Sequence, residues 1–189
     1  DKNIRHTFVL ALGGNNLTND IAIGLRAPHA DAEKIKTRYG TCLSKSVSAD
    51  DMIEVPGMGG REARKLPRQI LGEILEPRME EIFTLAKREV YRAGLENSIP
   101  SGLVLTGGTS LLEGTTEIAE SVFNLQTRLG KPQGITGLVD VVNNPMYATG
   151  VGLVLYGAKN QTEKKFRIRD AHIFNRIVTQ MKRWFKDVV

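Results

Sequence analysis

The chain has 189 residues, of which 41% are hydrophobic and 25% charged, and this balance excludes a wholly disordered protein. The net charge of +5 is localised, because residues 164–189 hold 8 of the 26 Lys and Arg but only 2 of the 21 Asp and Glu. The rest of the chain is close to neutral, so we expect no nucleic-acid partner, and the lone Cys42 excludes an internal disulfide.

The first half of the chain alternates short apolar runs with helical patterns. It opens at Asp1, close to an apolar run and without a signal peptide or membrane span, so we expect a fragment that begins inside a fold. In chain order, the sequence predicts a buried strand at 8–12, a turn at 13–16, helices at 18–26 and 29–39, one or two short strands within 47–55, and a helix at 66–95 that is kinked or divided at Pro77.

The second half continues this alternation. Its predicted elements are a buried strand at 102–108 that ends in a glycine turn, a helix at 114–123, a strand at 125–129 and a helix at 145–156 capped by Asn144. Residues 158–170 are polar and lack core-forming periodicity, which is typical of a linker. Strands that alternate with helices indicate an α/β body.

The glycine turn after the strand at 102–108 is the first candidate site. Glycines let the backbone approach a ligand closely, and the N–H groups of Gly107, Gly108, Thr109 and Ser110 can face that ligand. A tight strand-to-helix turn without any ligand explains the same residues, so this pattern alone leaves both interpretations open. The chain has no P-loop sequence, which disfavours an ordinary P-loop enzyme.

Several blocks together resemble one protein family. Residues 102–110 (GLVLTGGTS) are similar to the adenosine motif of the actin, Hsp70 and MreB superfamily. Residues 13–22 (GGNNLTNDIA), 55–61 (VPGMGGR), 135–138 (ITGL) and 147–153 (YATGVGL) narrow the resemblance to the FtsA family of bacterial cell-division proteins. The resemblance runs from about residue 5 to residue 156 and resumes in the last residues.

The resemblance implies an α/β fold, namely the second lobe of the actin-like (RNase H-like) fold. Subdomain 2A is expected at 1–14 and 100–158, subdomain 2B at 15–99, a flexible linker at 159–170, and an amphipathic helix at 171–189. The resemblance also implies ATP as the cofactor, with Mg²⁺ in the full-length protein. The implied nucleotide-binding residues are Gly107, Gly108, Thr109, Ser110, Glu33, Lys36, Gly14 and Asn15.

Glu33 and Lys36 lie three residues apart, which puts both on one face of the helix at 29–39, although an exposed charged face explains them equally well. No catalytic and no metal-ligating residue is assigned. The first lobe of the fold, with its phosphate loop and metal-associated carboxylates, is missing from the resemblance. We therefore expect no ATPase activity from this chain alone.

A basic cluster surrounds the start of the helix at 66–95. A solvated helix face is the simpler interpretation of such a cluster. The resemblance implies instead a binding site on subdomain 2B for the C-terminal tail of FtsZ, whose acidic and apolar residues suit a basic rim around an apolar groove. The implied partner-binding residues are Arg78, Arg64, Arg61, Met79 and Ile82. The family further implies self-association of the full-length protein and contacts with other division proteins.

The C-terminal residues predict an amphipathic helix without reference to any family. Apolar residues fill one face of the helical projection and basic residues the other, which is typical of a helix lying on an anionic membrane. The predicted membrane-binding residues are Ile173, Phe174, Ile177, Val178, Met181, Trp184, Phe185 and Val188, with Lys182, Arg183 and Lys186 on the basic face. Docking of this helix on the body or on a partner helix is the alternative.

Together these expectations describe an actin-like ATP-binding adaptor that tethers FtsZ filaments to the membrane and helps recruit later division proteins. Its expected place is the cytoplasmic face of the bacterial inner membrane at the division site, as a peripheral protein. The alternatives are an MreB-like membrane-associated filament protein and a kinase-type enzyme that shares the actin fold. The sequence shows no obvious catalytic base for a kinase, and the C-terminal position of the amphipathic segment favours the adaptor.

Overall fold

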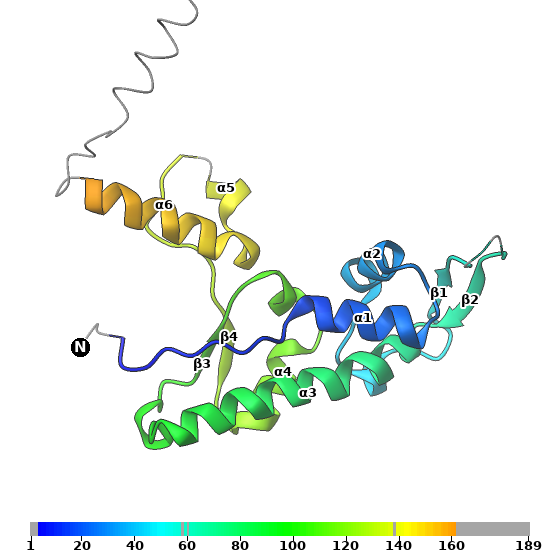
Figure 1. Ribbon diagram of the computed structural model, residues 1–189, viewed down its shortest axis with the longest axis horizontal. Coiled ribbons are helices and arrows are strands. Elements are labelled where there is room, and N and C mark those ends of the chain that lie inside the picture. Colours follow the sequence, from blue (N-terminus) through cyan, green and yellow to red (C-terminus); the bar gives the residue numbers. More distant parts are fainter. Residues whose placement is uncertain (1–3, 58, 60, 138, 162–189) are drawn as a thin grey trace, which may run out of the picture. The chain divides into compact units, whose positions relative to one another are not determined.

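The computed structural model describes residues 4–57, 59, 61–137 and 139–161, and Figure 1 shows how its elements follow one another. The chain divides into two compact units, Asp1–Val151 and Gly152–Val189. The elements are α1 (Gly14–Gly24), α2 (His29–Tyr39), the 3₁₀ turn η1 (Ser44–Ser46), β1 (Met52–Val55), β2 (Arg64–Pro67), α3 (Gln69–Arg92), η2 (Glu96–Ser98), β3 (Leu103–Leu105), η3 (Gly108–Leu111), α4 (Thr115–Phe123), β4 (Thr127–Leu129), α5 (Val139–Val142), η4 (Pro145–Tyr147) and α6 (Ala148–Gln161).

The core of the first unit forms between α1, α2, β1, α3 and α4. Apolar residues recur at every fourth position on α1 and α3, which places them on one face of each helix. Figure 1 shows these two helices side by side, so their apolar faces pack together and fix the direction of α1. The residues of the two faces, all at most 8% exposed, are Leu17, Ile21, Leu25, Leu71, Leu75, Met79 and Phe83.

Two small sheets flank this core. β1 and β2 pair antiparallel, with Met52 opposite Pro67 and Val55 opposite Arg64. β3 and β4 pair in parallel, which requires a crossover connection, and α4 provides it. The β3–α4–β4 segment is the α/β arrangement that the alternating pattern predicted, and the helices at 29–39 and 114–123 agree with the structure to within one residue.

The predicted strand at 8–12 is wrong. These residues have no helix or strand assignment, and Val9 is 87% exposed. A strand exists only where a neighbour completes its hydrogen bonds, and no described backbone bond beyond the helices and strands involves these residues. The apolar run therefore does not form the paired, buried strand that the sequence predicted.

Other elements also differ from the expected ones. Residues 66–67 end β2 because they pair with Ile53 and Met52, so the long helix starts later than predicted. That helix, α3, continues through Pro77 as one element. Helix α6 extends to Gln161, so residues 159–161 of the expected linker are helical, as suits Lys and Gln, which are good helix formers. None of the described helices has the length and hydropathy needed to cross a membrane.

Cys42 is fully buried beside Thr115, with 3.9 Å between Sγ and Oγ1. Burial raises the pKa of the Cys42 thiol to about 11. Because the thiolate is the reactive form, we expect a thiol reagent at pH 8 to label the folded chain about 100-fold more slowly than the chain unfolded in urea. Above pH 9 the unfolded thiol ionises first, so stability falls as the pH rises toward 11. Equal labelling rates in the folded and unfolded chain would contradict this prediction.

Candidate functional site

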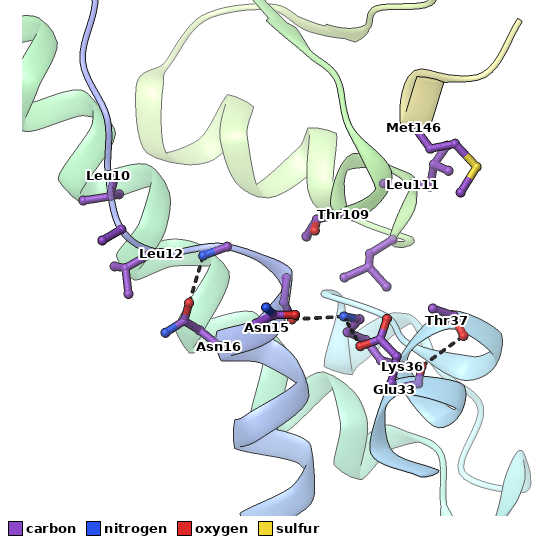
Figure 2. A pocket seen from close by; sticks show the side chains of 15 residues that line it. Leu10, Leu12, Asn15, Asn16, Glu33, Lys36, Thr37, Thr109, Leu111 and Met146 are labelled. Atoms are coloured by element: carbon purple, nitrogen blue, oxygen red, sulfur yellow. Dashed lines mark hydrogen bonds and ion pairs between the residues drawn. The ribbon is translucent and has the colours of Figure 1, made fainter. Parts of the chain in front are cut away.

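A cavity of about 810 Å³ opens between the start of α1, helix α2 and the glycine turn that leads into η3. Figure 2 shows Glu33 and Lys36 of α2 pointing toward one another, with Thr109 of the glycine turn also facing the cavity. With Met146 of η4, the cavity is therefore built by four segments far apart in the sequence. Its lining residues are Leu10, Ala11, Leu12, Gly13, Gly14, Asn15, Asn16, Glu33, Lys36, Thr37, Gly108, Thr109, Leu111, Leu112 and Met146.

Lys36 is the polar centre of the site. Buried Ala32 and Ile35 anchor α2 on the core, and Lys36 follows Ile35 into the interior with 6% exposure. Its ammonium group donates to the carbonyl of Gly14 at 3.0 Å, to Thr18 Oγ1 at 2.7 Å and to Glu33 Oε2 at 2.6 Å. These bonds use all three donors of the ammonium and connect α2 to the first turn of α1.

Glu33 lies at the mouth of the cavity, and its side chain is 43% exposed. Burial alone raises its pKa, but hydrogen bonds from Lys36 and Thr18 outweigh that effect and hold the pKa below its ordinary value. Both bonds reach the same oxygen, Oε2. The hydrogen bonds accepted by Oε2 thus keep the carboxylate ionised. The other oxygen, Oε1, has no partner among the described residues.

The loop before α1 approaches the glycine turn closely. A Cβ added at Gly14 would lie 2.6 Å from Thr109 Oγ1 and 3.4 Å from Lys36 Nζ. Asn16 fixes the loop, because its side chain accepts a hydrogen bond from the Gly13 N–H at 2.9 Å. Glycine at position 14 therefore lets the backbone of this loop lie close to the Thr109 side chain on the facing wall.

The glycine turn has a conformation that only glycine adopts readily. Gly107 has a φ of 93°, its N–H donates to the carbonyl of Pro145 at 3.0 Å, and its carbonyl accepts from Ser110 Oγ at 2.7 Å. The next N–H groups, of Gly108 and Thr109, have no partner in the described part of the chain outside the turn itself. Backbone donors at the start of a helical turn suit an anionic group such as a phosphate.

Six of the eight predicted nucleotide-binding residues line this one cavity, namely Gly14, Asn15, Glu33, Lys36, Gly108 and Thr109. Gly107 and Ser110 lie outside the lining and instead hold the turn in shape. The sequence analysis missed Met146 and the leucines that complete the wall. It also missed Thr18, which lies behind the wall and bonds to Glu33 and Lys36. Within the described residues, no group of three or more His, Cys, Asp or Glu is arranged to hold a metal ion.

The predicted partner-binding residues lie in different environments. Arg61 and Arg64 are exposed and line a second cavity of about 450 Å³, where Arg64 also donates to the carbonyl of Leu25. Arg78 is not free, because it donates to Asp20 at 2.6 and 3.1 Å and to Glu81. These hydrogen bonds, that to Asp20 foremost, raise the pKa of Arg78.

The two apolar residues of the predicted partner site also differ in their exposure. Met79 is 2% exposed and belongs to the core face of α3, so its side chain does not line a surface. Ile82 is half-buried on the same helix. The predicted membrane-binding residues 173–188, with the whole expected C-terminal helix, lie outside the described residues.

Comparison with family models matches residues 1–152 of the chain to the family described as Cell division protein FtsA. The chain belongs to the FtsA family of cell-division proteins. This confirms the family expected from the sequence blocks and decides against the MreB-like and kinase-type alternatives.

Curated relatives agree with this membership. The Cell division protein FtsA of Pseudomonas aeruginosa is 51% identical over 160 residues, covering 85% of this chain and 38% of the relative. That of Escherichia coli K12 is 38% identical over 190 residues, covering 97% of this chain and 44% of the relative. The chain therefore spans less than half the length of these relatives.

Solved structures show the fold. The structure of MreB5 of Spiroplasma citri bound to ADP is similar with a TM-score of 0.55 and 15% identity, covering 82% of this chain and 47% of MreB5. The same protein bound to AMPPNP gives a TM-score of 0.56 over 82% of this chain and 46% of that one. At this level of identity the likeness concerns the fold alone, and it confirms the actin-like α/β class.

Proposed function

We propose that this chain forms half of the ATP site of an actin-like cell-division adaptor. The observation that carries the proposal is the cavity in which Gly14, Glu33 and Lys36 face Gly108 and Thr109. Structures of MreB5, which has the same fold, were obtained with ADP and with AMPPNP, and this supports a nucleotide as the ligand.

The residues present fit ATP by their chemistry. The N–H groups of Gly108 and Thr109, which have no recorded partner outside the turn in the described residues, suit phosphate oxygens. The Glu33 carboxylate suits hydroxyl donors such as those of a ribose. The close approach of Gly14 to Thr109 leaves no room for a side chain between the two walls. We propose that Gly108 and Thr109 bind the phosphate side, that Glu33 binds the sugar side, and that Mg²⁺ accompanies the nucleotide in the full-length protein.

A pair of substitutions at Gly108 tests this proposal. A Cβ at this position would meet only Met146 Cβ at 4.0 Å, so Gly108→Ala fits the fold, and Gly108→Asp adds a carboxylate to that Cβ. Calorimetric titration with ATP and Mg²⁺ is expected to show binding by the wild-type chain and by Gly108→Ala. The added carboxylate of Gly108→Asp repels phosphate, and binding is expected to fall at least about tenfold. Equal binding by the two variants would exclude the glycine turn as the phosphate site.

The proposed partner is the C-terminal tail of FtsZ, with other division proteins and self-association in the full-length protein. Arg61, Arg64 and Ile82 offer exposed basic and half-buried apolar groups, which suit an acidic and apolar peptide. Arg78 joins this surface only when a peptide carboxylate displaces Asp20. Asp20 therefore competes with the peptide for the same guanidinium.

We expect Asp20→Asn to raise, and Arg78→Ala to lower, the affinity for an FtsZ tail peptide. The decrease is smaller than the roughly tenfold effect of one charge-assisted hydrogen bond, because the bond to the peptide replaces the bond to Asp20. Fluorescence anisotropy of a labelled peptide measures both changes. Arg92→Ala is the matched control, because Arg92 lies on the same helix and pairs with Glu89 three residues before it. An unchanged affinity in Arg78→Ala would remove Arg78 from the surface.

We also propose that residues 171–189 bind the anionic cytoplasmic face of the inner membrane at the division site. The support is the sequence pattern, with Trp184 and Phe185 on the apolar face and Lys182, Arg183 and Lys186 on the basic face. Co-sedimentation with anionic liposomes compares the full chain, a chain ending at Asn160, and the double variant Trp184→Glu/Phe185→Glu. Binding by the full chain alone, weakened by salt, is expected. If no version binds, the segment docks on protein instead.

A further inference from the structure

Thr18 is a buried polar residue that the expected ligand contacts leave unexplained. It lies on the first turns of α1 and is 0% exposed, so no ligand in the cavity can reach it without rearrangement. Nevertheless its hydroxyl meets three polar groups of the site. Lys36 donates to it at 2.7 Å, the Gly14 carbonyl lies at 3.0 Å, and Glu33 Oε2 accepts from it.

The hydroxyl has one proton to give and two acceptors within reach. The Gly14 carbonyl already accepts from Lys36 at 3.0 Å, whereas the carboxylate is charged and forms the stronger bond. Thr18 thus accepts from the ammonium and donates to the carboxylate. Thr18 therefore closes the ion pair between Lys36 and Glu33 into a ring of three side chains, of which Glu33 and Lys36 line the cavity.

This ring determines which groups remain for a ligand. All three donors of Lys36 are used within the protein, and Glu33 Oε2 accepts two hydrogen bonds. Glu33 Oε1 is the oxygen left over, on a side chain that is 43% exposed at the mouth of the cavity. A carboxylate fixed at one oxygen presents the other in a defined direction. This arrangement favours a ligand with a hydroxyl group there over a deoxy analogue, in which a hydrogen atom replaces the hydroxyl.

We infer that Thr18 is a positioning residue of this site, which locks Glu33 and Lys36 so that Glu33 Oε1 selects a ribose hydroxyl of the ligand. Lys36 then acts as a clamp between α1 and α2 that holds the Gly14 loop. This inference rests on the proposed nucleotide site and adds to it the residue that gives the site its preference for ribose.

The test compares ATP with its 2′-deoxy and 3′-deoxy analogues in wild-type chain, Thr18→Val and Thr18→Ser. Wild-type chain is expected to prefer ATP over at least one analogue by about tenfold, the effect of one hydrogen bond to a charged group. Thr18→Val keeps the shape of the side chain but loses the hydroxyl, so the preference falls to below about threefold. Thr18→Ser restores it. A structural role alone would weaken all three nucleotides equally and leave the preference intact.

Thr115→Val is the matched control, because Thr115 is 3% exposed and, among the described residues, the one recorded contact of its hydroxyl is with Cys42. This variant also loses a buried hydroxyl and is expected to keep the full preference for ATP. If Thr18→Val does not fold, Thr18→Cys replaces it, since a thiol has a similar volume and is a weak donor.

A measurement without ligand separates this inference from the proposed function. NMR titration of the Glu33 carboxyl is expected to give a higher pKa in Thr18→Val than in wild-type chain, with Lys36 and His29 as the remaining cations near it. A wild-type chain that binds no nucleotide would overturn the proposed function and the ribose preference together. Binding with an unchanged preference and an unchanged Glu33 titration in Thr18→Val would overturn this inference alone.

Discussion

We expect Lys36→Met to lower the affinity of the chain for ATP by about 100-fold, because all three hydrogen bonds of the ammonium are lost together. The ammonium of Lys36 holds the Gly14 carbonyl and the Glu33 carboxylate at 3.0 and 2.6 Å. Methionine fills the same volume but donates nothing. The loop before α1 is then no longer tied to α2, and Glu33 keeps a single hydrogen bond.

Lys34→Met is the control for this prediction. Lys34 lies two residues away on the same helix, its side chain is 77% exposed, and its partner is Asp31. An exposed pair of this kind contributes little to stability, about 0–1 kcal/mol, so the control is expected to bind ATP like wild-type chain. Calorimetric titration measures both variants, and their thermal midpoints show whether either has lost its fold. A Lys36→Met chain that folds and binds ATP normally would show that the clamp is not part of the site.

We expect Gly102→Ala to destabilise the chain by about 3 kcal/mol, as the sum of backbone strain and overpacking. Gly102 has a φ of 81°, and a Cβ there would lie 2.1 Å from the carbonyl oxygen of Gln126. That carbonyl accepts the hydrogen bond from the Leu103 N–H that begins the β3–β4 pairing. The methyl group therefore pushes apart the two strands that precede and follow α4.

Gly134→Ala separates the two causes. Gly134 also has a positive φ, 74°, but a Cβ there would meet nothing within 4 Å. Its alanine variant carries the backbone strain alone, and about 1 kcal/mol of destabilisation is expected. Urea denaturation measures both variants. If the two lose equal stability, the close approach to Gln126 has no energetic consequence and the prediction is wrong.

Local signals predicted part of the fold well. Helix α2 was predicted from Pro28 to Gly40 because these residues start and stop a helix whatever surrounds them. The segment at 8–12 was mispredicted because pairing depends on a neighbour, which an apolar run cannot reveal. Leu66 and Pro67 were assigned to a helix because the antiparallel partner at Met52 and Ile53 is not visible in their own sequence.

The candidate site shows the same division. Glu33 and Lys36 were predicted because their spacing of three residues is a property of one helix. Thr18 was missed because only packing brings α1 against α2 and sets its hydroxyl beside both charges. Met79 was assigned to a surface although it belongs to the four-residue series of Leu71 and Leu75. That periodicity was present in the sequence and places Met79 in the core.

The ion pair between Arg78 and Asp20 also affects how the binding of an acidic peptide depends on ionic strength. A peptide carboxylate that takes Arg78 from Asp20 exchanges one ion pair for another, and Asp20 returns to water. Screening by salt weakens the pair that is lost and the pair that is gained alike. For the proposed peptide site we therefore expect an affinity at this arginine that varies little with salt, with apolar contacts such as that of Ile82 supplying most of the binding free energy.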